Sequence, residues 1–155
     1  RNTTFENCEW NGQLHQSVRA PMEGFESVTD NANMGFTGGI AAMAEGCTFS
    51  GCVFNGQISA TGKNIGGIAG YARKTSITKC SATKASEIYT TYHCAGSMAG
   101  AMTQNSLISE CSTAGKVASF DHCGGIVGYL QSGKVEKCVV SSSAMKIVAP
   151  SSIIK

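Results

Sequence analysis

A seven-residue stretch that occurs four times constrains this chain more than any other feature of its sequence. Ile65–Tyr71 reads I-G-G-I-A-G-Y, and near-copies begin at Thr37, Ala95 and Cys123. The first glycines of the four copies are 28, 30 and 28 residues apart, at Gly38, Gly66, Gly96 and Gly124. A cysteine follows each of them after 14 or 15 residues, at Cys52, Cys80, Cys111 and Cys138. Two markers in phase over four copies identify a repeat protein.

Apolar side chains also recur in phase with these cysteines. Three residues before each cysteine the side chain is always apolar, in the order Phe5, Phe49, Ile77, Ile108 and Val135. Runs rich in Thr, Val, Ile and Ser, separated by Gly, Asn and Ser, are typical of short strands joined by tight turns. A coil of about 28 residues cannot bury its own apolar side, but parallel coils stacked about 4.8 Å apart can. We therefore predict an all-β fold, a parallel β-solenoid (β-helix) that we expect to be right-handed, with the small residues of G-G-I-A-G packed inside the coil.

The repeat phase predicts how the single solenoid domain, residues 1–155, is divided. The segment at 4–14, T-F-E-N-C-E-W-N-G-Q-L, aligns without a gap with 48–58, T-F-S-G-C-V-F-N-G-Q-I. This predicts a half-coil at 1–14, an inserted excursion at 15–36, and coils at 37–64, 65–93, 94–122 and 123–155. We interpret the excursion as a loop or short helix extruded from the stack, which serves either in binding or as a lid on the core.

Composition and motifs argue against several functional classes. Only 14% of the residues are charged and the net charge is +2, so there is no basic surface for nucleic acid. No apolar run approaches the roughly 18 residues of a membrane span. The only aspartates, Asp30 and Asp121, lie far apart in the repeat, and no H-E-x-x-H or phosphate-binding loop is present. We expect no enzymatic activity, no catalytic residues, no cofactor and no metal.

Most of the eight cysteines share one position of the repeat. We predict that these form an inward ladder of buried thiols, because cysteine packs as a small hydrophobe: Cys8, Cys52, Cys80, Cys111 and Cys138. The residue before the cysteine is Lys79, Glu110 and Lys137 in successive coils. Stacked in register, these residues would alternate in charge on the outer surface.

Cys94 and Cys123 stand outside this ladder, and each follows a histidine. A Cys94–Cys123 disulfide between adjacent coils is our first expectation, with buried free thiols as the alternative. A zinc site of the two His-Cys pairs is a further alternative. It is disfavoured because neighbouring residues on a strand point to opposite faces.

The pattern G-G-I-(A/V)-G-Y followed by (I/V)-x-(K/N)-C resembles the GLUG repeat. Gly66–Cys80 and Gly124–Cys138 carry the resemblance best, whereas Ser97-Met98 replaces Gly-Ile in one copy. The resemblance implies an extracellular or cell-surface protein of bacterial origin with a stalk, adhesive or assembly role. It implies no catalytic residues.

The sequence around the two termini suggests a filament. Ser151-Ser152-Ile153 lies within one residue of the position expected for a further glycine marker. Residues 1–14 match only the second half of a coil, and the half that contains the marker is missing. We therefore expect head-to-tail stacking of subunits. The expected assembly interface comprises Arg1, Thr3, Phe5, Trp10, Val148, Pro150, Ile153 and Ile154. The alternatives are a slice or stalk segment of a longer surface protein, and an adhesin module that binds a glycan or a protein through Tyr89, Tyr92 and Phe120.

Overall fold

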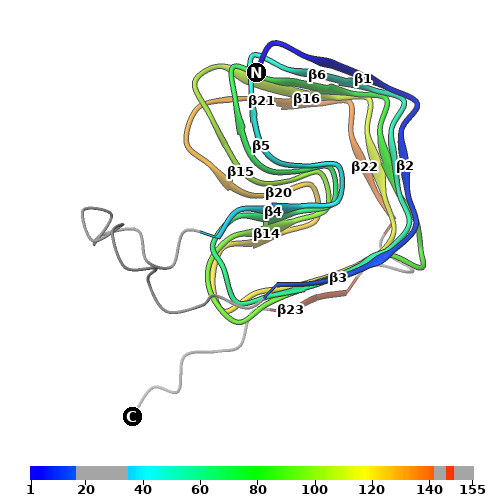
Figure 1. Cartoon of the computed structure of the whole chain (residues 1–155), viewed down its shortest axis with the longest axis vertical. Coiled ribbons are helices and arrows are strands. Elements are labelled where there is room, and N and C mark those ends of the chain that lie inside the picture. Colours follow the sequence, from blue (N-terminus) through cyan, green and yellow to red (C-terminus); the bar gives the residue numbers. More distant parts are fainter. Residues whose placement is uncertain (17–34, 142–145, 149–155) are drawn as a thin grey trace.

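The chain is a parallel β-solenoid of about four turns, with coils about 29 residues apart. The computed structural model describes residues 1–16, 35–141 and 146–148, the last three by their backbone alone. Viewed along the stack, the coils superimpose and every strand lies over its counterpart in the next coil (Figure 1). The predicted fold class is therefore confirmed.

Five parallel sheets form the walls of the solenoid. The first contains β1 (Thr4–Glu6), β6 (Thr48–Ser50), β11 (Ser76–Thr78), β16 (Ser106–Ser109) and β21 (Gly133–Glu136). The second contains β2 (Glu9–Trp10), β7 (Val53–Phe54), β12 (Ser81–Ala82), β17 (Ser112–Thr113) and β22 (Val139–Val140). The third contains β3 (Gln13–Gln16), β8 (Gln57–Ala60), β13 (Glu87–Thr90), β18 (Lys116–Ala118) and β23 (Lys146–Val148).

The repeated glycine stretch builds the other two sheets. One contains β4 (Thr37–Gly38), β9 (Ile65–Gly66), β14 (Ala95–Gly96) and β19 (Cys123–Gly124). The other contains β5 (Ala41–Glu45), β10 (Ala69–Arg73), β15 (Ala99–Thr103) and β20 (Val127–Leu130). These two sheets double back into the coil, so that each turn has an indented outline with two lobes (Figure 1).

The bend between these two sheets, which we call the inward fold, contacts the opposite wall. A Cβ atom added to Gly67 would lie 2.7 Å from Cδ1 of Phe54 and 2.4 Å from the carbonyl oxygen of Ser97. A Cβ atom added to Gly39, one coil earlier, would lie 2.9 Å from Cδ2 of the same ring. Only glycine allows the backbone to approach the Phe54 ring this closely. The repeated G-G pair is thus required by packing inside the coil.

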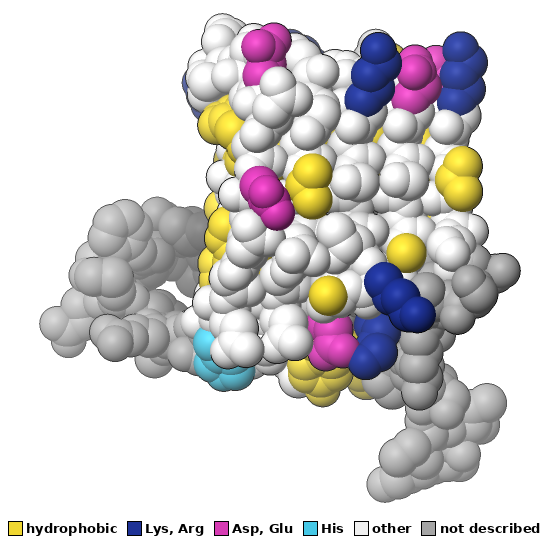
Figure 2. Space-filling model, turned by 90° about the vertical axis from the view of Figure 1, so that its right-hand side faces the viewer, with side chains coloured by type: hydrophobic (Ala, Val, Ile, Leu, Met, Phe, Trp, Pro, Cys, Tyr) yellow, Lys and Arg dark blue, Asp and Glu magenta, His cyan; other side chains and the backbone are white. Residues whose placement is uncertain are grey.

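Left-handed residues form the corner between the first and second sheets. The residue before each ladder cysteine has a positive φ, between 52° and 63°, in all five coils: Asn7, Gly51, Lys79, Glu110 and Lys137. A residue in this conformation turns the chain sharply, which rotates the next strand into a new wall. The last three of these residues are exposed. Figure 2 shows a row on this side of the molecule in which basic, acidic and basic side chains follow one another.

Stacked columns of apolar side chains and thiols fill the interior of the coil beside the first and second sheets. The rings of Phe5 and Phe49 stack at 4.7 Å between centroids, and those of Trp10 and Phe54 stack at 5.4 Å. The five ladder cysteines lie in one column, in which Cys52, Cys80 and Cys111 are at most 1% exposed. Several thiols donate to a carbonyl of the preceding coil, as from Cys52 to Phe5 at 3.5 Å. Burial raises the pKa of the Cys52 thiol, so it remains protonated.

Candidate functional site

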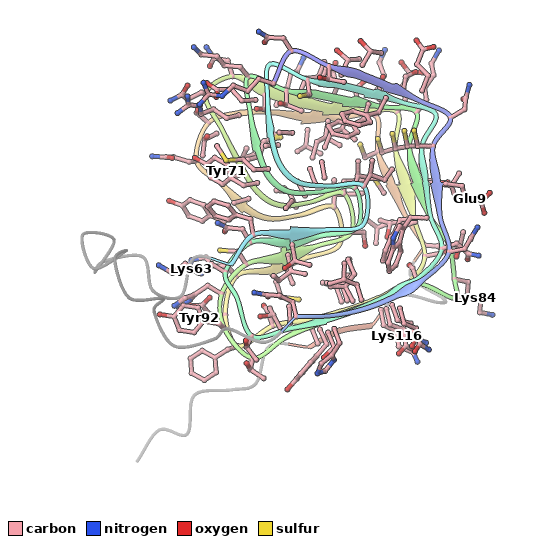
Figure 3. All side chains as sticks on the ribbon, in the orientation of Figure 1. Glu9, Lys63, Tyr71, Lys84, Tyr92 and Lys116 are labelled. Atoms are coloured by element: carbon pink, nitrogen blue, oxygen red, sulfur yellow. The ribbon has the colours of Figure 1, made fainter. Side chains whose placement is uncertain are left out.

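A pocket in the described part of the chain lies at the mouth of the indentation. This mouth pocket has a volume of about 410 Å³. One wall is the sheet containing β10, β15 and β20, which contributes Tyr71, Ala101, Thr103 and Tyr129, together with Gln131 just after β20. The other is the segment just before β9, β14 and β19, which contributes Lys63, Asn64, His93, Cys94 and His122. Figure 3 shows Tyr71 on one side of the mouth, with Lys63 and Tyr92 on the other.

The second wall is a corner at which each coil carries different side chains. The register pairs Ile65 with Ala95, and Ala95 with Cys123. Counting back from these pairs, the corner has two columns: Lys63, His93 and Asp121, then Asn64, Cys94 and His122. The second column is left-handed throughout, with φ of 38°, 55° and 40°.

This register corrects the expected pairing of the two His-Cys dipeptides. Cys123 lies in the column of Ala95, whereas Cys94 lies one position earlier, with His122. Cys94 and Cys123 are not joined by a disulfide bond. The Cys123 thiol instead donates to the carbonyl of Val117 at 3.5 Å. Cys94 and Cys123 thus stand one position apart in the repeat, so stacking of the coils does not place them in the same column.

The corner brings two imidazoles and one carboxylate together across adjacent coils. His93 Nδ1 lies 2.5 Å from Asp121 Oδ2, and His122 Nδ1 lies 2.8 Å from Asp121 Oδ1. Partial burial raises the pKa of Asp121, but the hydrogen bonds from His122 and His93 outweigh it, and the pKa is lowered overall. The carboxylate is therefore ionised at neutral pH and holds the two rings beside it.

Two tyrosines pack against these histidines. Tyr92 meets His93 edge-on at 4.0 Å between centroids, and Tyr129 meets His122 edge-on at 5.4 Å. The Nζ atom of Lys63 lies over the Tyr92 ring, 5.8 Å from its centroid. The aromatic contacts restrict rotation of both imidazoles, so that the cluster is supported from both sides.

Cys94 is the buried thiol of this corner. It is 8% exposed, and burial together with the negative charge of Asp121 raises its pKa to about 11. The thiol is therefore protonated at neutral pH, and this makes Cys94 a poor nucleophile.

The three aromatic residues predicted to bind a ligand lie in different surroundings. Tyr89 is 49% exposed on β13 and lines a separate groove of about 370 Å³ with residues of β3 and β8. Tyr92 belongs to the histidine cluster, and Phe120 is 52% exposed. The mouth pocket takes its aromatic character from Tyr71 and Tyr129, which the sequence analysis did not select.

The residues predicted for assembly that the structure describes lie at the two ends of the stack. Phe5 is in β1 and Trp10 is in β2, the first strands of their sheets, while Arg1 and Thr3 precede β1. Val148 ends β23, the last strand of the third sheet. Pro150, Ile153 and Ile154 lie outside the described residues, as does 17–34, most of the predicted excursion.

Comparison with models of protein families, with curated proteins and with solved structures finds no match. The resemblance to the GLUG repeat therefore depends on the motif residues alone. The described residues contain no helix long and apolar enough to cross a membrane.

Proposed function

We propose that this chain is a non-enzymatic structural protein whose solenoid continues from subunit to subunit, head to tail, as a filament or surface fibre with an adhesive or scaffold role. Its extracellular or cell-surface location is part of the proposal and is supported by the GLUG resemblance. The observation that carries the proposal is that the sheets and core columns run to both ends of the described stack.

The strands at both ends offer edges for pairing. Within residues 1–16, 35–141 and 146–148, β1 and β2 have a partner on one side only, and so have β21 and β22. An unpaired strand edge is a template for another chain. The core columns also continue to these ends: Phe5 and Trp10 are half-buried at one, and Val140 is 42% exposed at the other.

A second copy of the chain is the partner that best matches these ends. If β1 and β2 of one copy pair with β21 and β22 of the next, the columns place Phe5 on Val135 and Trp10 on Val140. The columns then remain apolar across the joint. Such a contact uses two different surfaces and repeats along the axis, so it generates a filament and not a closed ring.

One column of residues is unfavourable for this contact between subunits. It runs from Glu6 through the first sheet to Glu136, so stacked subunits would bring these two carboxylates together. Lys134 Nζ lies 2.5 Å from Glu136, and this ion pair reduces the repulsion. The apolar columns are buried in the joint whereas the glutamates lie at its rim, where water screens their charges.

The test is electron microscopy with analytical ultracentrifugation of the chain at micromolar concentration. We expect thin unbranched filaments for the wild type. Val140→Lys should abolish them, because it places a charge where Trp10 of the next subunit would pack. Val139→Lys is the matched control: Val139 lies in the outward column of Ser112, and its variant should still polymerise.

Dispersed wild-type particles would contradict the filament, and so would unchanged filaments of Val140→Lys. Dispersed particles would favour the second candidate, a stalk segment or adhesin module that binds a glycan or a protein. The observation in favour of that module is the mouth pocket. It has a volume of about 410 Å³ and is lined by Tyr71 and Tyr129 on one side and by the corner residues on the other. Aromatic rings in such a pocket are suited to stacking on a ligand.

A further inference from the structure

We infer that His93, Asp121 and His122 bind a divalent first-row transition metal ion, Zn²⁺ being the ion we would test, at the rim of the mouth pocket. One ligand atom of each residue lies within 4.8 Å of those of the other two. Two imidazoles and one carboxylate form a ligand set that such metals prefer. The inference does not depend on filament formation.

The cluster needs only a small movement to hold the ion. Asp121 now lies 2.5 Å from His93 and 2.8 Å from His122, with hydrogen bonds at both Nδ1 atoms. Ligand atoms of a tetrahedral zinc site are about 3.3 Å apart, given bonds of about 2.0–2.1 Å. The ion would replace the hydrogen-bonding protons at the two Nδ1 atoms, and the separations of 2.5 and 2.8 Å from the carboxylate would widen to about 3.3 Å. Three protein ligands leave a coordination position open.

The surroundings favour an accessible site. The side chains of His93, Asp121 and His122 are 31%, 35% and 50% exposed, so an ion can reach them from solvent. Both histidines also line the mouth pocket, which places the open coordination position beside room for water or a small ligand. Lys63, which stands in the column of His93 and Asp121, has its ammonium over the Tyr92 ring.

The backbone at this corner is not a regular strand. In a regular strand adjacent residues point to opposite faces, which disfavoured a metal at the two His-Cys pairs. His122 instead has a φ of 40° and precedes β19, so it lies at a bend and reaches the same carboxylate as His93. Cys94, which follows His93 in the sequence, is buried and lies outside the three-residue cluster.

The experiment is calorimetric titration of the full chain with Zn²⁺ after treatment with a chelator, for the wild type and two variants. His122→Asn removes one ligand and suits the left-handed bend, because Asn64 occupies the same column in an earlier coil with a φ of 38°. His15→Asn is the matched control: His15 lies in β3, is exposed, and is the one histidine outside the cluster. We expect one ion per wild-type chain, unchanged binding for His15→Asn, and binding at least about tenfold weaker for His122→Asn.

Cobalt identifies the ligands independently of affinity. A Co²⁺ ion bound by nitrogen and oxygen shows visible absorption without a thiolate-to-metal charge-transfer band, as expected here. A thiolate band, no uptake by the wild type, or equal binding by the wild type and His122→Asn would overturn the inference. If His122→Asn does not fold, His93→Lys provides the same test, because it reproduces Lys63 of the preceding coil.

Discussion

The inward fold and the corner before it belong to the same coils, yet they use the repeat in opposite ways. At the inward fold, Gly39 and Gly67 are repeated because Phe54 and a neighbouring carbonyl leave no room for a side chain. At the corner, successive coils carry Lys63, His93 and Asp121, and the three side chains differ in charge and chemistry. Residues are therefore repeated where the backbone is most tightly packed, and side chains are free to form a site where it faces solvent.

Ser97 is the one departure from glycine at the second marker position, and it follows the same steric rule. Ser97 replaces the glycine of Gly39 and Gly67, and the opposite wall there carries Thr113 in the column of Phe54. The smaller Thr113 leaves space for the serine, and its hydroxyl donates to Ser97 Oγ at 2.7 Å. In this coil the serine thus stands opposite a small hydroxyl side chain, to which it is hydrogen-bonded, and not opposite an aromatic ring.

The largest expected effect comes from filling the inward fold. Gly67→Ala would place a methyl group 2.4 Å from the Ser97 carbonyl and 2.7 Å from the Phe54 ring, so backbone must move. We expect the free energy of unfolding to fall by about 3 kcal/mol or more. Chemical denaturation followed by circular dichroism measures this loss.

The matched control for Gly67→Ala is Gly12→Ala. A Cβ atom there would approach only the movable Trp10 ring, at 3.2 Å, and should cost well under half as much. If both variants lower the free energy of unfolding equally, the close approach at the inward fold is not the reason that glycine is repeated from coil to coil.

An intermediate effect is expected at the departure itself. Ser97→Ala removes the hydrogen-bond partner of Thr113, which is only 2% exposed. Because the buried hydroxyl group of Thr113 is then left without this partner, the chain should be destabilised by about 1–3 kcal/mol. The double variant Ser97→Ala/Thr113→Val removes both hydroxyl groups and should recover most of this loss. A double-mutant cycle by denaturation gives the coupling between the two sites. Additive losses would mean that the hydrogen bond does not connect them.

The fold was predictable from the sequence because the positions that packing constrains are the ones that repeat. Parallel coils superimpose the same residue types, so the glycine stretch, the apolar column of Phe49 and Ile77 and the ladder cysteines all appear as a repeat of about 28 residues. Each of these positions is constrained by packing, and packing is the same in every coil.

The corner was not predictable by the same means. No motif marks it, since its side chains differ in every coil, and its left-handed bend uses Cys94 and His122, which carry no turn signal. The proximity of His93 to Asp121 follows only from the register, in which they stand at the same position of adjacent coils. Counting back three residues from each marker glycine would have found this pair. The sequence also does not show that the chain bends into the coil at the glycine pair, because glycine permits a bend in either direction.

The smallest expected effect lies at the rim of β5, β10 and β15, where side chains again differ between coils. Glu45 is paired in register with Arg73, and Arg73 with Thr103. Arg73 Nε donates to Glu45 Oε1 at 3.1 Å, and Arg1 lies 2.8 Å from the other carboxylate oxygen. The hydrogen bond from Arg73 is the main cause of the lowered pKa of Glu45. Because this is a partly exposed pair, we expect Glu45→Gln to reduce the melting temperature only slightly at neutral pH.

The sign of the pH dependence makes this small effect measurable. The pKa of Glu45 is lowered on folding from its ordinary value of 4.5, so its contribution to stability is present above pH 4.5 and is lost as the pH falls through the lowered value. The difference in melting temperature between wild type and Glu45→Gln should therefore shrink progressively below pH 4.5 and remain constant between pH 6 and 8. A difference that persists in acid would mean that Glu45 acts through packing. The rim would then resemble the inward fold, where steric fit and not charge determines the residue in each coil.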